Sequence, residues 1–315
     1  MNPNIAGFDL PLLDEGDKLN RILASTLGNQ LPTATQLSYS YQSISQLPQP
    51  YWDATHFGLE RVAIFQDASS TEQQAIAQIA SQGLLLEAYF VEKAGMGYMA
   101  KMLLLAETLE ERMLYSLFAA EEATHLAQIR GFFAPQDEGE EKESTSTDDP
   151  FLRFLSDLLE TEDKAILLFI IQVVLEGWGL SHYRSLAKGC SHLELGQLFE
   201  QFLQAEARHH GSGLMLFNQI SLSKPSQSAI VEALILFLRM VQVGPQRVLS
   251  AIAQVKGDLS RLQQIQVLQE LETEIQSGAR LSYLRSLMQK TTAHAIVQEL
   301  EERGSFKPFP AEKCI

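Results

Sequence analysis

Glu-Ala-Thr-His at residues 122–125 and Glu-Ala-Arg-His at residues 206–209 are the two stretches that determine the expected fold. In each, a histidine follows a glutamate by three positions, which places both side chains on one face of an α-helix. A carboxylate and an imidazole on one helical face can bind the same metal ion. Both stretches lie in segments dominated by Ala, Leu, Glu and Gln, the composition of long helices. The sequence therefore predicts two metal-binding helices.

Each stretch belongs to a predicted pair of antiparallel helices. Glycine and proline are sparse over residues 71–134 and 151–220, and neither block shows the alternating pattern of a strand. Capping boxes, in which Glu or Gln follows a Ser or Thr by three positions, start at Ser70, Thr108 and Ser191. A weaker helix start lies near residue 161. The expected helices cover residues 71–105, 109–133, 162–188 and 192–218.

A metal site inside such a pair needs a second carboxylate on the preceding helix, at an equal distance from the connecting turn. Glu206 lies 15 residues after Ser191, and Glu176 lies 15 residues before it. In the first pair, Glu122 and Glu87 lie symmetrically about the expected turn. Glu87 and Glu176 also interrupt apolar runs, where an unpaired carboxylate is costly. Each pair of helices is therefore expected to combine one Glu with one Glu-x-x-His.

Six ligands follow from this arrangement. Four buried carboxylates need cations, and two divalent metals would balance their charge. Mixed carboxylate and imidazole ligands suit iron or manganese, whereas structural zinc favours cysteine. Glu92 competes with Glu87, although the neighbouring Lys93 favours a surface position for it, and His210 competes with His209. The predicted ligands are Glu87, Glu122, His125, Glu176, Glu206 and His209.

This set resembles the ferritin-like di-iron carboxylate superfamily, in which two helices each give a Glu and two others each give a Glu-x-x-His. The resemblance covers about residues 71–218. It implies an all-α fold, a ferritin-like four-helix bundle of two antiparallel hairpins joined by a long crossover. Residues 135–150 of that crossover are acidic and almost devoid of apolar side chains, so a mobile loop is expected there. Asp149 and Pro150 then begin a short helix.

Three parts of the chain are expected on this basis. Residues 1–70 form an N-terminal extension packed on the bundle, with one helix at about 13–27. Residues 71–220 form the di-metal bundle, and residues 221–315 form a C-terminal helical extension. One apolar face of this extension is marked by Leu262, Ile265, Leu268, Leu271 and Ile275. The C-terminal helices are expected near residues 226–241, 245–256, 258–276 and 279–302.

The resemblance also implies an activity. A non-haem di-iron oxidoreductase of this kind uses two iron ions, or manganese or a mixed Mn/Fe pair, with O2 as co-substrate. The expected function is an O2-dependent oxidase or oxygenase of a small, apolar organic substrate, supplied with electrons by an unknown donor. One alternative is a ferroxidase or iron-handling ferritin-like protein, although the long extensions disfavour a storage cage. The other alternative is a non-enzymatic helical adaptor.

Two residues near the ligands are expected in secondary roles. Arg208 matches the D-E-x-R-H form common in the superfamily, where the arginine supports the ligands. Ala205 stands where the aspartate of that form is usual, which puts the support of the opposite histidine in doubt. Tyr183 lies two helical turns after Glu176, and packing is expected for it more than redox chemistry.

Two glycines follow Glu176 closely. Gly177 and Gly179 lie inside a predicted helix, where each costs about 1 kcal/mol relative to alanine. Two such residues beside a ligand indicate that something needs the space. Either a substrate cavity lies beside Gly179, or the helices pack closely around Trp178.

Composition excludes several partners. The 315 residues carry 24 Lys and Arg against 39 Asp and Glu, a formal net charge of -15. A chain this acidic has no general attraction for nucleic acid or anionic lipid, so neither nucleic acid nor membrane is expected as a partner. Two cysteines, the lack of a secretory leader and apolar runs far below the roughly 20 residues of a membrane helix favour a cytoplasmic location. A small-molecule substrate is expected, and a homodimer stays open.

Overall fold

The computed structural model describes residues 49–133 and 149–315, and these residues are helical, with no β-strand among them. The helix expected at residues 13–27 and nearly all of the acidic loop lie outside the described residues. One unit of the fold comprises Gln49–Ala88 with Thr147–Ile315, and Tyr89–Ser146 belongs to a second unit.

The second unit contains an antiparallel helical hairpin. It consists of the latter part of α3 (Ser70–Leu105) and of α4 (Leu109–Arg130). Tyr89 contacts Phe133 near one end of the hairpin, with ring centroids 5.5 Å apart. The expected start of α4 is confirmed, because the Thr108 hydroxyl accepts a hydrogen bond from the Glu111 amide.

Two of the other expected caps are wrong by one residue. At the start of α3, Ser69 rather than Ser70 accepts from the Glu72 amide, and the Glu72 carboxylate accepts from the Ser69 amide in return. The start of α9 (Leu193–Phe217) is capped by the ring of His192. The Ser191 hydroxyl instead donates to backbone carbonyls near residue 50. These caps still place both helices within a residue or two of their expected ranges.

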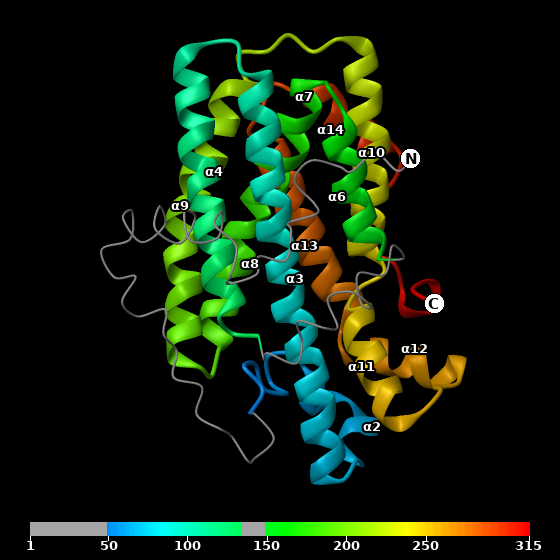
Figure 1. The fold of residues 1–315 in the computed structure, drawn as a ribbon. Coiled ribbons are helices and arrows are strands. Elements are labelled where there is room, and N and C mark those ends of the chain that lie inside the picture. Colours follow the sequence, from blue (N-terminus) through cyan, green and yellow to red (C-terminus); the bar gives the residue numbers. More distant parts are fainter. Residues whose placement is uncertain (1–48, 134–148) are drawn as a thin grey trace, which may run out of the picture. The chain divides into compact units, whose positions relative to one another are not determined.

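The helix expected over 162–188 runs from Lys164 to Gly189, and its middle is a π-helix. It consists of α7 (Lys164–Leu167), the π segment η3 (Leu168–Leu175) and α8 (Glu176–Gly189). Asp163 caps its first turn, two residues after the expected start. In Figure 1, α8 and α9 lie side by side as an antiparallel pair.

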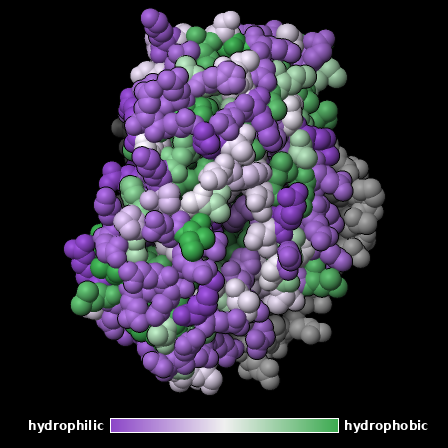
Figure 2. Space-filling model, turned by 180° about the vertical axis from the view of Figure 1, so that it is seen from behind, coloured by the Kyte–Doolittle hydropathy of each residue, from purple (hydrophilic) through white to green (hydrophobic). Residues whose placement is uncertain are grey.

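This helix is also the one helix in the described ranges that is long and apolar enough to cross a membrane by length and composition. More than half of its most apolar window is buried in the protein, as in the core helix of a globular fold. The face shown in Figure 2 is mainly hydrophilic, and its apolar residues are scattered among polar ones.

The helix expected after Asp149 is confirmed. In α6 (Pro150–Glu160), the Asp149 carboxylate accepts hydrogen bonds from the first backbone amides, and Pro150 occupies the first turn. One face of α6 is buried and packs on α10 (Lys224–Gln242), where the Phe154 ring stacks on Phe237 at 5.7 Å. The side chains buried on this face are Phe154, Leu155, Leu158 and Leu159.

The C-terminal helices agree with expectation only in part. The expected ranges match α10 and α11 (Gln246–Lys256) but not α12 (Arg261–Glu270), α13 (Thr273–Met288) and α14 (His294–Glu302). Glu272 adopts a left-handed backbone with φ 53°, which separates α12 from α13. The middle of the expected apolar face is confirmed, because Leu268 and Leu271 are buried and Ile265 packs against the same core. Its two ends are wrong, because Leu262 and Ile275 are exposed.

A separate apolar core lies where α11 and α12 meet the first part of α3. Figure 1 shows α2 (Ala63–Gln66), α11 and α12 gathered at one end of this unit. Two short 3-10 turns, η2 (Leu59–Arg61) and η4 (Ala311–Lys313), complete the described elements. The largest side chains of this core include Leu59, Phe65, Ile76, Ile252 and Leu268.

Candidate metal centre

The hairpin of α3 and α4 brings together a cluster of three potential metal ligands. Glu92 comes from α3, whereas Glu122 and His125 come from one face of α4. The exposed fractions of the three residues are 1%, 3% and 7%. The Nδ1 atom of His125 lies 3.0 Å from Oε2 of Glu92 and 3.8 Å from Oε2 of Glu122. We call these three residues the first cluster.

The carboxylates of the first cluster favour a positive charge between them. Burial lowers the pKa of His125, but the neighbouring Glu92 and Glu122 carboxylates outweigh burial and raise it to about 10. The same two carboxylates would also stabilise a bound cation.

A glycine that the sequence did not single out shapes the first cluster. A Cβ atom on Gly95 would lie 2.9 Å from Oε2 of Glu122 and 3.1 Å from its carboxyl carbon. The glycine therefore lets the Glu122 carboxylate lie directly against the backbone of α3. Its sequence signal is its spacing, because Gly95 follows Glu92 by three residues and so lies on the same side of the helix.

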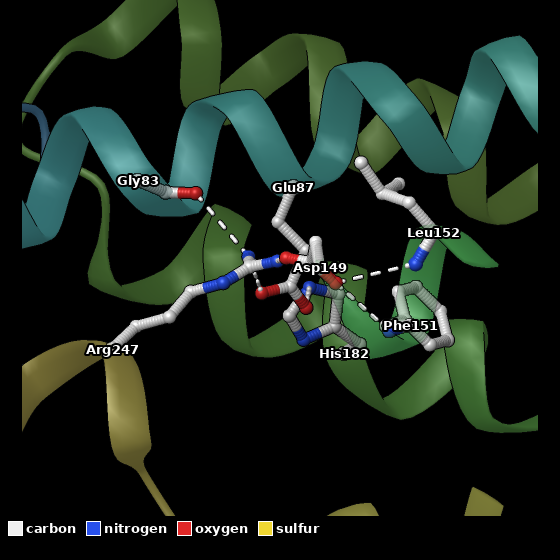
Figure 3. A network of polar contacts seen from close by, with 7 residues as sticks. All are labelled: Gly83, Glu87, Asp149, Phe151, Leu152, His182 and Arg247. Atoms are coloured by element: carbon white, nitrogen blue, oxygen red, sulfur yellow. Dashed lines mark hydrogen bonds and ion pairs between the residues drawn. The ribbon is translucent and has the colours of Figure 1, made fainter. Parts of the chain in front are cut away.

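Glu87 lies elsewhere, in a network of ion pairs. Figure 3 shows the Arg247 guanidinium reaching the carboxylates of both Glu87 and Asp149, with the ring of His182 beside them. Arg247 also donates to the Gly83 carbonyl. The sequence prediction placed Glu87 opposite His125, and the structure places Glu92 there instead.

The remaining three predicted ligands form a second cluster. Glu176 is the first residue of α8, and Glu206 and His209 lie on one face of α9. Their ligand atoms all lie within 4.8 Å of one another. His209 is fully buried, Glu206 is 5% exposed and Glu176 is partly buried. The structure thus brings together the carboxylate and the Glu-x-x-His that the sequence paired. We call these three residues the second cluster.

The π segment η3 ends directly before Glu176 and is hydrogen-bonded to α9. The buried side chain of Gln172 donates hydrogen bonds to the His209 carbonyl at 2.7 Å and to the Ser212 hydroxyl at 3.0 Å. A Cβ atom on Gly213 would lie 2.5 Å from the Gln172 side chain, so a glycine is needed for this contact. Short π segments inside α-helices occur frequently at functional sites. Gln172 was not predicted, because a lone Gln in an apolar run carries no motif.

His210 contacts a backbone carbonyl rather than the ligands of the second cluster. Its Nδ1 atom lies 3.3 Å from the Gln172 carbonyl oxygen. Burial is the main cause that lowers the pKa of His210, which favours a neutral ring donating to that carbonyl. Of the two candidates, His209 is therefore the one that joins Glu176 and Glu206.

The two glycines after Glu176 have different surroundings. A Cβ atom on Gly177 would lie 2.8 Å from the His210 ring and 3.1 Å from Leu287, so this glycine permits close packing. At Gly179 the nearest described atom would be Oε2 of Glu206, at 3.9 Å, which is an ordinary contact. A methyl group could therefore be added at Gly179 without a clash, beside a carboxylate of the second cluster.

Tyr183 and Arg208, the two residues expected in secondary roles, differ in burial. Tyr183 is 1% exposed and belongs to an aromatic group, stacked on Phe199 at 5.6 Å and edge-on to Phe202 at 5.7 Å. Arg208 is exposed on α9, whereas Ala205 is buried. Packing thus accounts for Tyr183, and the exposure of Arg208 sets it apart from the buried ligands of its own helix.

Comparison of the chain with protein-family models, with curated proteins and with solved structures gives no match in any of the three.

Proposed function

We propose that the chain binds two iron ions, one at each cluster, and acts as an O2-dependent oxidase or oxygenase of a small, apolar organic substrate. The observation that carries the proposal is the repetition of one donor set, two carboxylates and one imidazole, in two clusters of buried or partly buried side chains. Manganese or a mixed Mn/Fe pair would suit the same donors.

The donor sets fit such ions. Each cluster gathers its ligand atoms within 4.8 Å, close enough for one ion to contact all three. Burying a carboxylate costs several kcal/mol unless a cation compensates it. An adaptor protein would have no need for two buried groups of this kind, which supports metal binding over the adaptor alternative.

The chain's own residues would hold and orient the ions. Gln172 fixes the backbone of His209, and Gly95 allows Glu122 to approach α3. Bound iron supplies the redox chemistry with O2 that no side chain can provide. The glycine at position 179 favours an organic substrate over iron handling alone, because a missing side chain beside Glu206 is what access of a substrate to the ion would require.

Metal analysis tests the proposal. We expect the full chain, produced with added iron, to contain about two iron ions, and His125→Ala or His209→Ala to lose about one each, because each removes the only imidazole of its cluster. His294→Ala is the control, since His294 is exposed at the start of α14.

Three outcomes are informative. A folded chain without iron would exclude the proposal and favour the adaptor. Two irons that oxidise with O2 but never turn over an organic compound would favour iron handling. Equal iron loss in His294→Ala would show that the assay reports general damage to the protein.

A further inference from the structure

Glu176 lies at the point where its helix changes from π to α winding. Its backbone amide donates to the Ile171 carbonyl, five residues earlier, and the regular helix α8 begins at Glu176 itself. An α-helix joins residues four apart, whereas a π turn joins residues five apart. The direction of the Glu176 side chain therefore depends on the contacts that hold this junction, in addition to regular helical winding.

Side chains from two other helices hold the junction by hydrogen bonds. Because the Glu176 amide bonds five residues back, it leaves the Gln172 carbonyl, four residues back, to another donor. The His210 ring of α9 takes that place, with Nδ1 3.3 Å from the carbonyl oxygen. On the other side of Glu176, the Tyr283 hydroxyl of α13 donates to the Gly177 carbonyl at 3.0 Å. The backbone is thus bound on both sides of the ligand.

The same two helices enclose Gly177. A Cβ atom on this residue would lie 2.8 Å from Cε1 of His210 and 3.1 Å from Cδ1 of Leu287. Leu287 is buried and follows Tyr283 by four residues, so both lie on one face of α13. This helix packs against both η3 and α8, and Figure 1 shows it in orange beside α8. The backbone next to Glu176 therefore has little freedom to move.

The two helices differ in what else they contribute. Helix α9 carries Glu206 and His209, so a change in its contacts alters the ligands themselves. Helix α13 carries no ligand of either cluster and reaches the second cluster only through the backbone of α8. An effect of α13 on metal binding can therefore be separated from loss of a ligand.

We propose that Tyr283 is a positioning residue for Glu176. Its hydroxyl holds the Gly177 carbonyl, and this contact keeps the Glu176 carboxylate directed toward Glu206 and His209. The assignment rests on the proposed function, because it takes Glu176 as a metal ligand. It makes the C-terminal part of the chain a contributor to a metal site whose ligands all precede residue 220.

Titration of the full chain with cobalt(II), a probe that does not require the exclusion of air, tests the assignment. His125→Ala is expected to leave only the second cluster able to bind, and His209→Ala only the first. Added to His125→Ala, Tyr283→Phe keeps the ring, removes one hydrogen bond and should weaken cobalt binding by about threefold to tenfold. The visible absorption of the bound cobalt should also change, because it depends on how the ligands are arranged. Added to His209→Ala, Tyr283→Phe should change neither property.

Two further variants separate positioning from general stability. Gly177→Ala must displace the His210 ring or Leu287, although alanine favours a helix, so it should weaken cobalt binding at the second cluster by a similar factor. Leu281→Val is the matched control, because Leu281 is fully buried on α13. It should lower the melting temperature at least as much as Tyr283→Phe, with cobalt affinity and absorption unchanged.

The outcomes distinguish this assignment from the proposed function. Equal cobalt affinity and absorption with and without the Tyr283 hydroxyl overturns the assignment alone. Equal weakening by Leu281→Val also overturns it, because the effect would then follow stability. A folded chain that binds neither cobalt nor iron overturns both proposals. A specific effect of Tyr283→Phe in a chain whose iron does not react with O2 would retain the assignment and remove the proposed activity.

Discussion

The two clusters contain the same ligand types but are constructed differently. In the first cluster, Glu92, Glu122 and His125 lie on regular α-helices, and Gly95 lets a carboxylate press against the neighbouring backbone. In the second cluster, a π segment precedes Glu176, and Gln172 holds the backbone of His209.

Their surroundings differ as well. The glycine of the first cluster is in close contact with its ligand, whereas Gly179 in the second leaves room beside Glu206. The same donor set thus occurs once with a carboxylate packed directly against a glycine and once with room for a methyl group beside a carboxylate.

The largest effect is expected from substituting, one at a time, the two glutamates of α3 that compete as ligands. Glu92→Gln should reduce iron content from about two ions to about one, because it removes a buried carboxylate 3.0 Å from His125. Glu87→Gln is the matched control and should keep both ions, because Glu87 pairs with Arg247. Iron is measured per folded chain by elemental analysis. Loss of iron in Glu87→Gln with retention in Glu92→Gln would reverse the assignment.

A smaller effect is expected where Gln172 connects the π segment to α9. Gln172→Leu should lower the free energy of unfolding by about 2 to 4 kcal/mol, because buried partners on α9 lose their hydrogen bonds. It should also weaken iron binding at the second cluster alone. Denaturant unfolding and iron titration measure the two effects.

Gln242→Leu separates these two effects. Gln242 is also buried and donates to two carbonyls, those of Gly304 and Lys307, near the C-terminus. We expect a similar loss of stability with unchanged iron binding. If both variants weaken iron binding equally, Gln172 has no specific role in positioning His209.

The smallest effect is expected from adding one methyl group beside each cluster. Gly95→Ala should displace the Glu122 carboxylate and weaken iron binding at the first cluster about tenfold, since 2.9 Å is too short for a Cβ contact. Gly179→Ala fits at 3.9 Å, so iron binding should persist while higher helix propensity stabilises the chain by up to about 1 kcal/mol. Competition with a metal-binding dye measures the affinities. Similar behaviour of the two variants would contradict the difference in packing.

The helical hairpins could be predicted because their signals are local. Caps, sparse glycine and the spacing of Glu-x-x-His depend on residues within a turn or two, so α3, α4 and α9 begin and end near their expected positions. The break at Glu272 could not be predicted in this way. A left-handed backbone is uncommon at a residue other than glycine, and no glycine or proline in the local sequence marks this position.

The choice between Glu87 and Glu92 shows where local reasoning fails. The two are five residues apart, about 140° around a helix, so only one can face His125. The charge of Lys93 favoured a surface position for its neighbour Glu92. Adjacent residues of an α-helix point about 100° apart, however, so one can be exposed while the other is buried. Lys93 instead extends over the Phe90 ring, while Glu92 is buried. The equal separation of 30 residues from Glu92 to Glu122 and from Glu176 to Glu206 was the better guide.

The π segment also has a consequence for how this chain can change by insertion or deletion. An α-helix turns by about 100° with each residue, and a π turn absorbs an additional residue without breaking the helix. Removing one residue from Leu168–Leu175 would restore regular α-helical winding and leave the residues that follow at nearly their present angle about the helix axis. Removing one residue from the regular turn of α7 would instead rotate everything that follows by about 100° and turn Glu176 away from Glu206 and His209. A single codon can therefore be lost from the π segment without changing the residues that α8 places beside α9, whereas the same loss just before it would separate the ligands of the second cluster.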